Sequence, residues 1–251
     1  ESTGVSSEDT ADSSSSQETV TEDTEKTEDV SDETVEEEAK EVSDSVKRIQ
    51  QMVDDYMDKY NLTAGMSDEE ITNAVFAATS DPRPDYEAII AEGNKLTEEE
   101  ANVLLSTYAE KVDTASKFYD TVVRMNNPVT IATHTVLDNI TLSDTKGNGS
   151  LSGDTYTAYA TSKGLLGGTD TNTITVKNTS TTDTIVLSFN AKGTGIGRGD
   201  SVTVNGTKLS DNTSTPFEVI LAPNSSFAVV VSAWGSSGNT TAKLSGFSKR
   251  V

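Results

Sequence analysis

The chain has 251 residues, no cysteine and a formal net charge of −22. The absence of cysteine excludes disulfide bonds, thiolate nucleophiles and metal sites with cysteine ligands. The negative charge disfavours nucleic acid and anionic membrane surfaces, because both carry charge of the same sign. No apolar run approaches the length of a transmembrane helix. We therefore expect protein or glycan partners at a surface, with no nucleic acid and no direct membrane insertion.

The negative charge is concentrated at the start of the chain. Residues 1–46 contain 17 Asp and Glu against two Lys, whereas the other 205 residues contain 24 acids and 17 bases. Residues 1–46 also lack Leu, Ile, Phe, Tyr and Trp. Such a segment cannot bury enough apolar surface to offset the entropy lost on ordering. We predict that residues 1–33 form a disordered acidic Ser/Thr/Glu tether.

A helical region is predicted over residues 34–127. Thr34 and Glu37 form a capping box, and Asn61 and Gly65 are typical of a helix end. Between them, apolar residues recur at alternating steps of four and three, which is the spacing of a helix with one buried face. The members of this stripe are Val35, Ala39, Val42, Val46, Ile49, Val53, Tyr56 and Tyr60.

Three further helices follow in the sequence. Ser67 with Glu70 caps a short helix, Pro82 and Pro84 interrupt it, and another short helix spans residues 85–92. Thr97 with Glu100 caps a long helix that ends at Asn126-Asn127-Pro128. Its stripe contains Ala101, Leu105, Tyr108, Val112, Ala115, Tyr119 and Val122. Two long helices joined by short ones favour an antiparallel helical bundle acting as a spacer. A parallel coiled coil between identical chains, and so a homo-oligomer formed through the helices, is the alternative.

From residue 128 to 251 the apolar period changes to two. Ile185, Leu187 and Phe189 share one strand face, and Val202 to Leu209 form a hairpin around Asn205-Gly206. Short Thr- and Val-rich strands separated by Gly, Asn and Ser turns predict an antiparallel β-sandwich, immunoglobulin-like or jelly-roll. The predicted class is therefore α+β multidomain, with the helical bundle first and the all-β sandwich last.

The sequence contains several partial motifs. Residues 144–152 resemble part of a calcium-binding loop, but Lys146 and Thr155 occupy ligand positions, so a plain β-turn is favoured. Arg198-Gly199-Asp200 is an RGD tripeptide in a Gly-rich loop. His134, the single histidine, lies in a strand pattern without a nucleophile elbow, so a structural role is favoured. We predict no catalytic residue, no cofactor and no metal site, and therefore no enzyme.

Trp234 is the one candidate ligand-binding residue. It is the single Trp of the chain, it follows a predicted strand, and with Tyr156 and Tyr159 it would offer a stacking platform for a sugar. Eight Asn-X-Ser/Thr sequons occur, which are either glycan acceptors or a result of the Asn- and Thr-rich composition. Their asparagines are Asn61, Asn139, Asn148, Asn178, Asn205, Asn212, Asn224 and Asn239.

The composition of residues 1–46 resembles the linkers that follow the lipidated cysteine in lipoproteins of Gram-positive bacteria. The segments 174–179 and 217–231 are similar to immunoglobulin-like domains of bacterial surface proteins, with Asn224 where their turn usually has Gly. The resemblance implies an extracellular, non-enzymatic surface protein that presents a β-sandwich on a helical spacer. Two alternatives remain: a decoration or fibre protein of a phage virion, and a carbohydrate-binding module.

Overall fold

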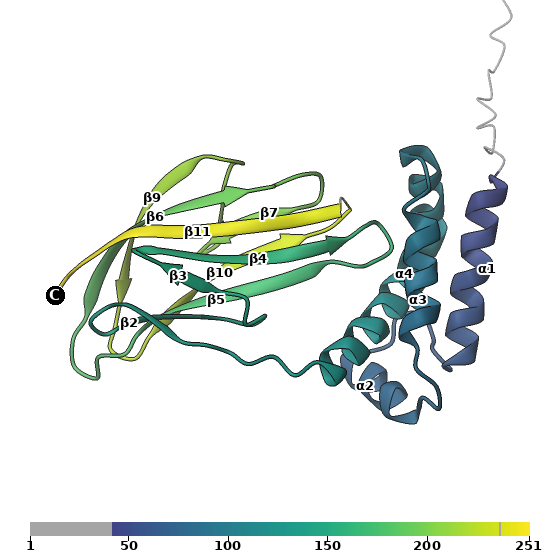
Figure 1. Ribbon diagram of the computed structural model, residues 1–251, viewed down its shortest axis with the longest axis horizontal. Coiled ribbons are helices and arrows are strands. Elements are labelled where there is room, and N and C mark those ends of the chain that lie inside the picture. The colour runs from purple at the N-terminus through teal and green to yellow at the C-terminus, as the bar shows by residue number, and fades with distance from the viewer. Residues whose placement is uncertain (1–41, 236) are drawn as a thin grey trace, which may run out of the picture. The chain divides into compact units, whose positions relative to one another are not determined.

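The structure is a computed structural model and describes residues 42–235 and 237–251 (Figure 1). The predicted tether of residues 1–33 and the Thr34 capping box lie outside these residues. The described chain from residue 42 onward belongs to one compact unit. It contains four helices followed by two antiparallel β-sheets, so the chain is an α+β protein with a sandwich-like C-terminal part.

The helices are α1 (Asp44–Lys59), α2 (Asp68–Ala77), α3 (Arg83–Gly93) and α4 (Glu98–Asn126). The predicted capping boxes of α2 and α4 are confirmed, with Ser67 and Thr97 each accepting from the third backbone N–H of the helix. The predicted stripe does not form one continuous helix, and its positions Val35 and Ala39 lie outside the described residues. Ser43 is extended and its hydroxyl caps α1, so the helix begins at Asp44 and does not continue back through Val42.

The two long helices run in the same direction. At their starts the Ser43 hydroxyl donates to Glu100 at 2.8 Å, and farther along the Tyr108 hydroxyl donates to Asp54 at 2.8 Å. The antiparallel pairing of these two helices, expected from their matched stripes, is therefore not what the contacts give. The apolar stripes indicate which face of each helix is buried. The relative direction of α1 and α4 depends instead on the path of the residues that connect them.

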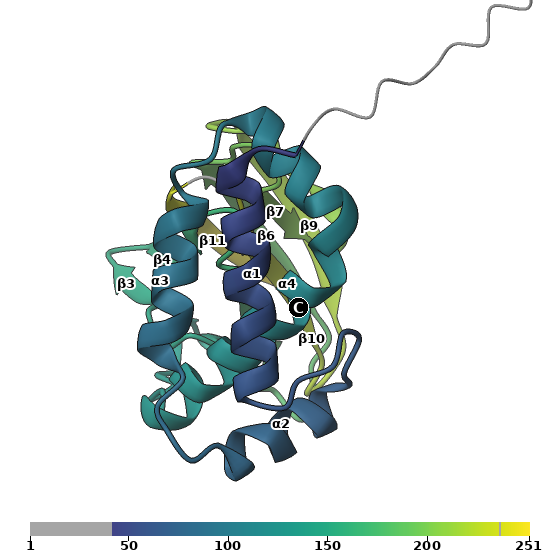
Figure 2. The ribbon, with the colours of Figure 1, turned by 90° about the vertical axis from the view of Figure 1, so that its right-hand side faces the viewer.

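Helix α3 brings the chain back from the end of α1 to the level of its start, where α4 begins. Lys59 at the end of α1 contacts Asp85 near the start of α3 at 2.6 Å, and Arg48 lies 3.6 Å from Glu92 near the opposite ends. α3 therefore runs antiparallel to α1, and Figure 2 shows the two side by side.

The helices share one apolar core. The predicted stripe positions from Val46 to Tyr60 are buried in it, as are Val112, Ala115, Tyr119 and Val122 of α4. Tyr56, Tyr60, Tyr86 and Phe118 pack with ring centroids 5.0–6.0 Å apart. Because aromatic rings bury large apolar areas, this cluster is the centre of the helical part.

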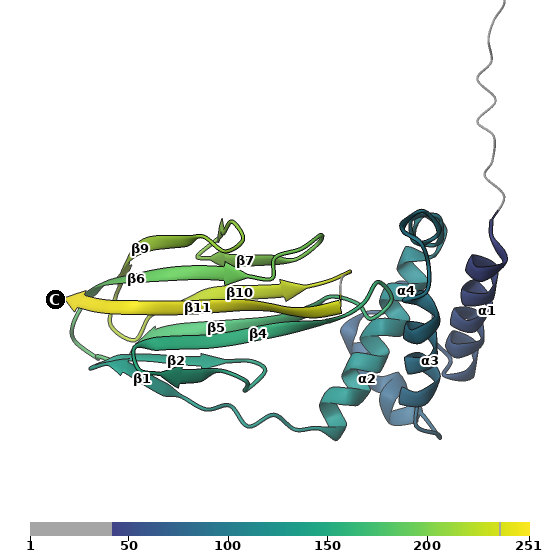
Figure 3. The same cartoon turned by 45° about the horizontal axis from the view of Figure 1, so that its top comes forward.

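Eleven strands form the sandwich. They are β1 (His134–Leu137), β2 (Ile140–Asp144), β3 (Ser150–Ser152), β4 (Thr155–Lys163), β5 (Asp170–Asn178), β6 (Ile185–Thr194), β7 (Ser201–Val204), β8 (Thr207–Lys208), β9 (Ser214–Leu221), β10 (Ser226–Ala233) and β11 (Ser237–Arg250). One sheet has the order β1-β2-β5-β10-β7-β8 and the other β3-β4-β11-β6-β9. Figure 3 shows β11 between β4 and β6.

Apart from β1, β3 and β8, successive strands alternate between the two sheets along the chain. β2, β5, β7 and β10 belong to one sheet, and β4, β6, β9 and β11 belong to the other. An immunoglobulin domain has the order ABED in one sheet and CFG in the other, so that D and E share one sheet and F and G share the other. The observed strand order therefore differs from that of an immunoglobulin domain.

Alternation of apolar residues explains the core between the sheets. Ile174, Val176, Ile185, Leu187 and Val229 are fully buried, while the residues between them on each strand are more exposed. The predicted hairpin is confirmed, because Asn205 and Gly206 both have positive φ, as a type I′ turn requires. None of the helices in the described residues is long and apolar enough to span a membrane.

Candidate functional site

The junction between helices and sandwich is built around one loop. Residues 164–169 connect β4 to β5, and Leu166 at the tip of the loop is 1% exposed. Its side chain belongs to the core of the helices and not to the core of the sandwich. The buried hydroxyl of Tyr86 in α3 donates to the Leu166 carbonyl at 2.6 Å. The sandwich is therefore anchored in the helical core through both the side chain and the backbone of Leu166.

Glycines allow this loop to approach the helices closely. Gly164 has φ +93°, and a Cβ there would lie 1.9 Å from Oδ1 of Asn94 at the end of α3. Gly168 has φ +71°, and a Cβ there would lie 2.0 Å from the Ser116 hydroxyl of α4. Any side chain at either position would be strained and would push the loop away from the helices.

Charged pairs flank the Leu166 anchor. Lys163 at the end of β4 lies 2.5 Å from Asp120 of α4, and its ammonium group lies 4.9 Å from the centre of the Tyr119 ring. Burial, with a further contribution from nearby Glu87, raises the pKa of Tyr119 to about 12, so its ring stays neutral at physiological pH. A second pair joins Arg198 of the β6–β7 loop to Glu98 of α4.

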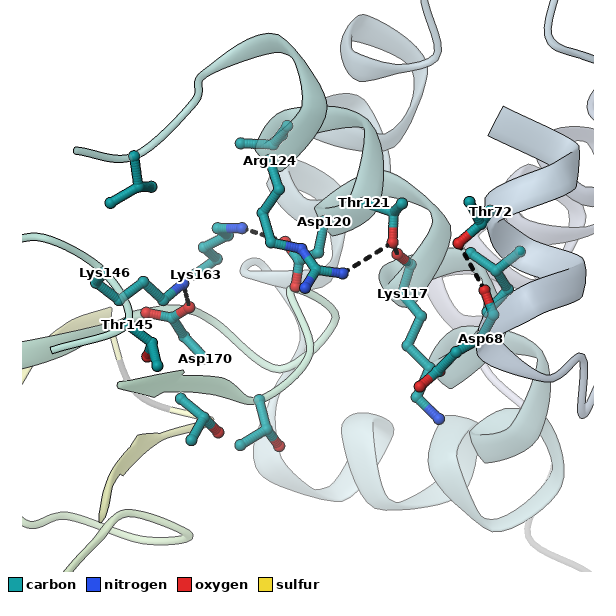
Figure 4. A pocket seen from close by; sticks show the side chains of 15 residues that line it. Asp68, Thr72, Lys117, Asp120, Thr121, Arg124, Thr145, Lys146, Lys163 and Asp170 are labelled. Carbon is teal, nitrogen blue, oxygen red and sulfur yellow. Dashed lines mark hydrogen bonds and ion pairs between the residues drawn. The ribbon is translucent and has the colours of Figure 1, made fainter. Parts of the chain in front are cut away.

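A cleft of about 530 Å³ opens beside this junction (Figure 4). Its walls come from α2, α4, the residues after α4 and the sandwich loops, so it exists only where both parts of the chain meet. The lining residues are Asp68, Ile71, Thr72, Lys117, Asp120, Thr121, Val123, Arg124, Val129, Thr145, Lys146, Lys163, Thr169, Asp170 and Thr171. The position, size and mixed polar lining make this cleft the candidate site.

The cationic side chains of the cleft differ in whether a carboxylate pairs with them. Lys146 forms an ion pair with Asp170, just as Lys163 does with Asp120. Arg124, in the last turn of α4, donates from one guanidinium nitrogen to the Thr121 hydroxyl at 3.1 Å. Within residues 42–235 and 237–251, no carboxylate lies within ion-pair distance of Arg124. Arg124 therefore retains donors that face solvent in the cleft.

Asp144 of the calcium-like loop is part of a closed hydrogen-bond network. Its carboxylate is 4% exposed and accepts from the backbone of Gly149 (2.8 Å) and Asn148 (3.2 Å), the Tyr156 hydroxyl (2.9 Å) and the Asn172 amide (3.0 Å). Burial acts to raise the pKa of Asp144, but these hydrogen bonds outweigh it and leave the pKa lowered. Donors surround the carboxylate where a cation would need to bind, which agrees with the structural turn favoured from the sequence.

The Arg and Asp side chains of the RGD tripeptide bind other groups of the same chain. Asp200 is 4% exposed, and its carboxylate accepts from the backbone N–H of Trp234 at 2.6 Å and of Gly197 at 2.9 Å. Arg198 is paired with Glu98 of α4. A partner that recognises this tripeptide would have to displace both sets of contacts.

Trp234, the residue predicted to bind a ligand, lies at the junction and not on a separate platform. One face of its indole covers Gly199, where a Cβ would be 2.3 Å from the ring. With Glu98, Asn102 and Arg198 it lines a second, smaller pocket of about 240 Å³. Tyr156 is fully buried in the sandwich core, so it cannot join Trp234 in stacking on a sugar.

The backbone accounts for most of the sequons. The non-glycine residues with positive φ in the described chain are Asn61, Asn139, Asn205, Asn212 and Asn224, and each begins a sequon. Asparagine tolerates this left-handed conformation better than other side chains do. Asn178 is fully buried and donates to three backbone carbonyls, so its amide is inaccessible in the folded chain. Turn geometry therefore accounts for the asparagine at five of the eight sequons.

The remaining polar candidates are His134, whose Nε2 is buried without a hydrogen-bond partner in the described residues, and the carboxylates of the cleft. The His134 ring packs edge-on against Tyr156 with centroids 5.5 Å apart. Of the three carboxylates in the cleft, Asp120 and Asp170 are paired with lysines. Among the described residues, no group of three His, Asp or Glu side chains is placed to hold a metal ion. The arrangement suits binding through hydrogen bonds and charge.

Sequence reasoning missed the loop that builds the junction. Leu165 and Leu166 stand between Gly164 and Gly167 in a segment that lies between two strands. Two adjacent leucines in an otherwise polar loop are a usable signal, since exposed loops seldom carry large apolar pairs.

No protein-family model, no curated protein and no solved structure matches this chain.

Proposed function

We propose that the chain is a non-enzymatic extracellular surface protein that presents its β-sandwich on the helical segment, for structural or binding purposes. The observation that carries this proposal is the burial of Leu166 of the sandwich in the core of the helices. A flexible spacer would need no such anchor. A rigid support holds the sandwich loops in a fixed orientation, as surface recognition requires.

Three further contacts support a fixed orientation. The Tyr86 hydrogen bond, the Lys163–Asp120 pair and the Arg198–Glu98 pair lie at different places around the junction. Contacts at separate points resist rotation as well as separation. In this proposal the helices act as a short rigid bundle whose two long helices run in the same direction.

Surface location is tested with an antibody raised against the sandwich. Intact cells or particles that carry the chain are stained before and after mild protease treatment. We expect staining without permeabilisation and its loss after protease. A chain that is stained only after lysis, and that survives protease on intact cells, would contradict the proposal. Recovery of the chain in purified virions would instead support the alternative of a phage decoration or fibre protein.

The carbohydrate-binding alternative depends on Trp234 and its small pocket. A glycan array probed with the wild-type chain and with Trp234→Ala tests it. Binding that disappears in the variant supports this alternative, whereas equal binding removes Trp234 from consideration. Thermal melting of the variant shows whether any loss comes from unfolding at the junction.

A homo-oligomer formed through the helices is less favoured by the packing. Val46, Ile49 and Val53 of α1 are buried within a single chain. A coiled coil between chains would have to withdraw these side chains from that core. Light scattering after size-exclusion chromatography should therefore give the mass of one chain, and a stable dimer would require another interface.

A further inference from the structure

The cleft beside the junction is a local concentration of cations in an acidic protein. It is lined by four cationic side chains (Lys117, Arg124, Lys146 and Lys163) and three acidic ones (Asp68, Asp120 and Asp170). The whole chain carries −22. Lys117, Lys146 and Lys163 each have a carboxylate partner, which is Asp113, Asp170 and Asp120 respectively. Among the described residues, Arg124 is the cation of the cleft without an ion pair, and low-dielectric walls focus the field of such a charge.

Two of the four cations are available to a ligand. Among the described residues, the Arg124 guanidinium group hydrogen-bonds to the Thr121 hydroxyl and has no ion pair, and the side chain is exposed. Lys117 lies 2.7 Å from Asp113, but both side chains are more than half exposed, and exposed pairs of this kind are weak. Arg124 and Lys117 stand on the same wall, seven residues apart on α4, which is two helical turns.

The rest of the lining suits a hydroxylated molecule. Thr169 and Thr171 add hydroxyl groups from the sandwich, and Ile71, Val123 and Val129 supply apolar surface. Hydroxyl groups can both donate to and accept from a sugar, and aliphatic side chains cover its C–H face. The volume of about 530 Å³ lies within the usual range of small-ligand sites.

We infer that this cleft binds a hydroxylated ligand bearing an anionic group, with Arg124 contacting the anion and Lys117 supporting it. The anion is a carboxylate or a phosphate, because the planar guanidinium group can bind either through two parallel hydrogen bonds. The inference rests on the proposed binding role of the chain and adds to it the ligand class and the residues that recognise the ligand. The proposed site is a different pocket from that of Trp234, and its ligand carries a negative charge.

The test uses three probes built on one sugar: glucose, glucuronate and glucose 6-phosphate. Binding to the full chain is followed by NMR shifts of backbone amides and by titration calorimetry. We expect dissociation constants of about 1 mM or lower for at least one anionic probe, with shifts confined to the cleft, and about tenfold weaker binding of glucose. Comparison of glucuronate with glucose 6-phosphate shows whether carboxylate or phosphate is the preferred anion.

Arg124→Gln should weaken binding of the anionic probe at least tenfold and leave glucose unaffected. Arg48→Gln is the matched control, because Arg48 is an exposed arginine of α1 that lies near Glu92 and does not line the cleft. Raising the ionic strength from about 0.01 to 0.15 M shortens the Debye length from about 30 to 8 Å and should weaken binding of the anionic probe alone.

Several outcomes overturn the inference. They are no binding of either anionic probe by the wild-type chain, equal binding of glucose, and unchanged binding by Arg124→Gln. None of them affects the proposed surface role, which the antibody experiment tests separately. Thermal melting of both variants excludes unfolding as the cause of a loss.

Discussion

Replacement of Leu166 by Ala removes the side chain that fixes the sandwich in the helical core. Leu→Ala substitutions in cores cost about 2–5 kcal/mol, and the cost is higher where the surroundings cannot close the cavity. Here the walls are rigid: a Cβ on Gly93 would lie 2.4 Å from the Leu166 side chain, and the Tyr86 ring is fully buried. We therefore expect a loss of about 3–4 kcal/mol in the free energy of unfolding.

If Leu166 fixes the sandwich to the helices, Leu166→Ala should also loosen the two parts relative to each other. Because the chain has no cysteine, spin labels can be placed at Asp55→Cys on α1 and Lys243→Cys on β11, both exposed positions. In the wild-type background the distance distribution between the labels should be narrow. In Leu166→Ala it should broaden under conditions in which both parts are still folded by circular dichroism.

Leu187→Ala is the matched control. Leu187 is fully buried in the core between the two sheets, so the same atoms are removed at a site remote from the junction. This variant should lose comparable stability without a broader distance distribution. If Leu166→Ala costs less than about 1 kcal/mol, or if its distribution is as narrow as that of the wild-type chain, the anchor does not hold the two parts together.

Three further variants test the surrounding structure. Tyr86→Phe should cost about 1–2 kcal/mol in chemical denaturation, because the hydroxyl donates at 2.6 Å to the Leu166 carbonyl in a buried site; a neutral effect would mean that water replaces this bond. Gly199→Ala should destabilise the chain by about 1–2 kcal/mol and shift the fluorescence of Trp234, since φ is +81° and the new Cβ would meet the indole ring; an unchanged spectrum would contradict this packing. Asp144→Asn should cost about 1–3 kcal/mol at pH 7, because several donors would lose a charged acceptor. The pKa of Asp144 is lower in the folded chain than its usual value, so its stabilisation is fully present above about pH 4 and is lost as the pH falls through the folded value. The difference in melting temperature between the wild-type chain and Asp144→Asn should therefore shrink toward pH 2, and a constant difference would refute the assignment.

Local patterns in the sequence determined the secondary structure well. The Ser67 and Thr97 capping boxes, the end of α4 before Pro128 and the hairpin at Asn205-Gly206 all form where the sequence places them. Each is decided by residues within about one turn of each other. The buried faces of α1 and α4 and the inward positions of the strands also follow, because the repeat of apolar residues alone specifies the face.

The tertiary structure alone decided how these elements meet. Tyr86 and Leu166 are 80 residues apart in the chain, and nothing local to either indicates that they pair. The shared direction of α1 and α4, the alternation of strands between sheets, and the cleft beside Arg124 likewise depend on which distant segments come together. Apolar periodicity predicts that a side chain is buried, but it does not predict which residue the side chain packs against. That choice is made by the packing of the whole chain, in which many residues contribute small contacts at once.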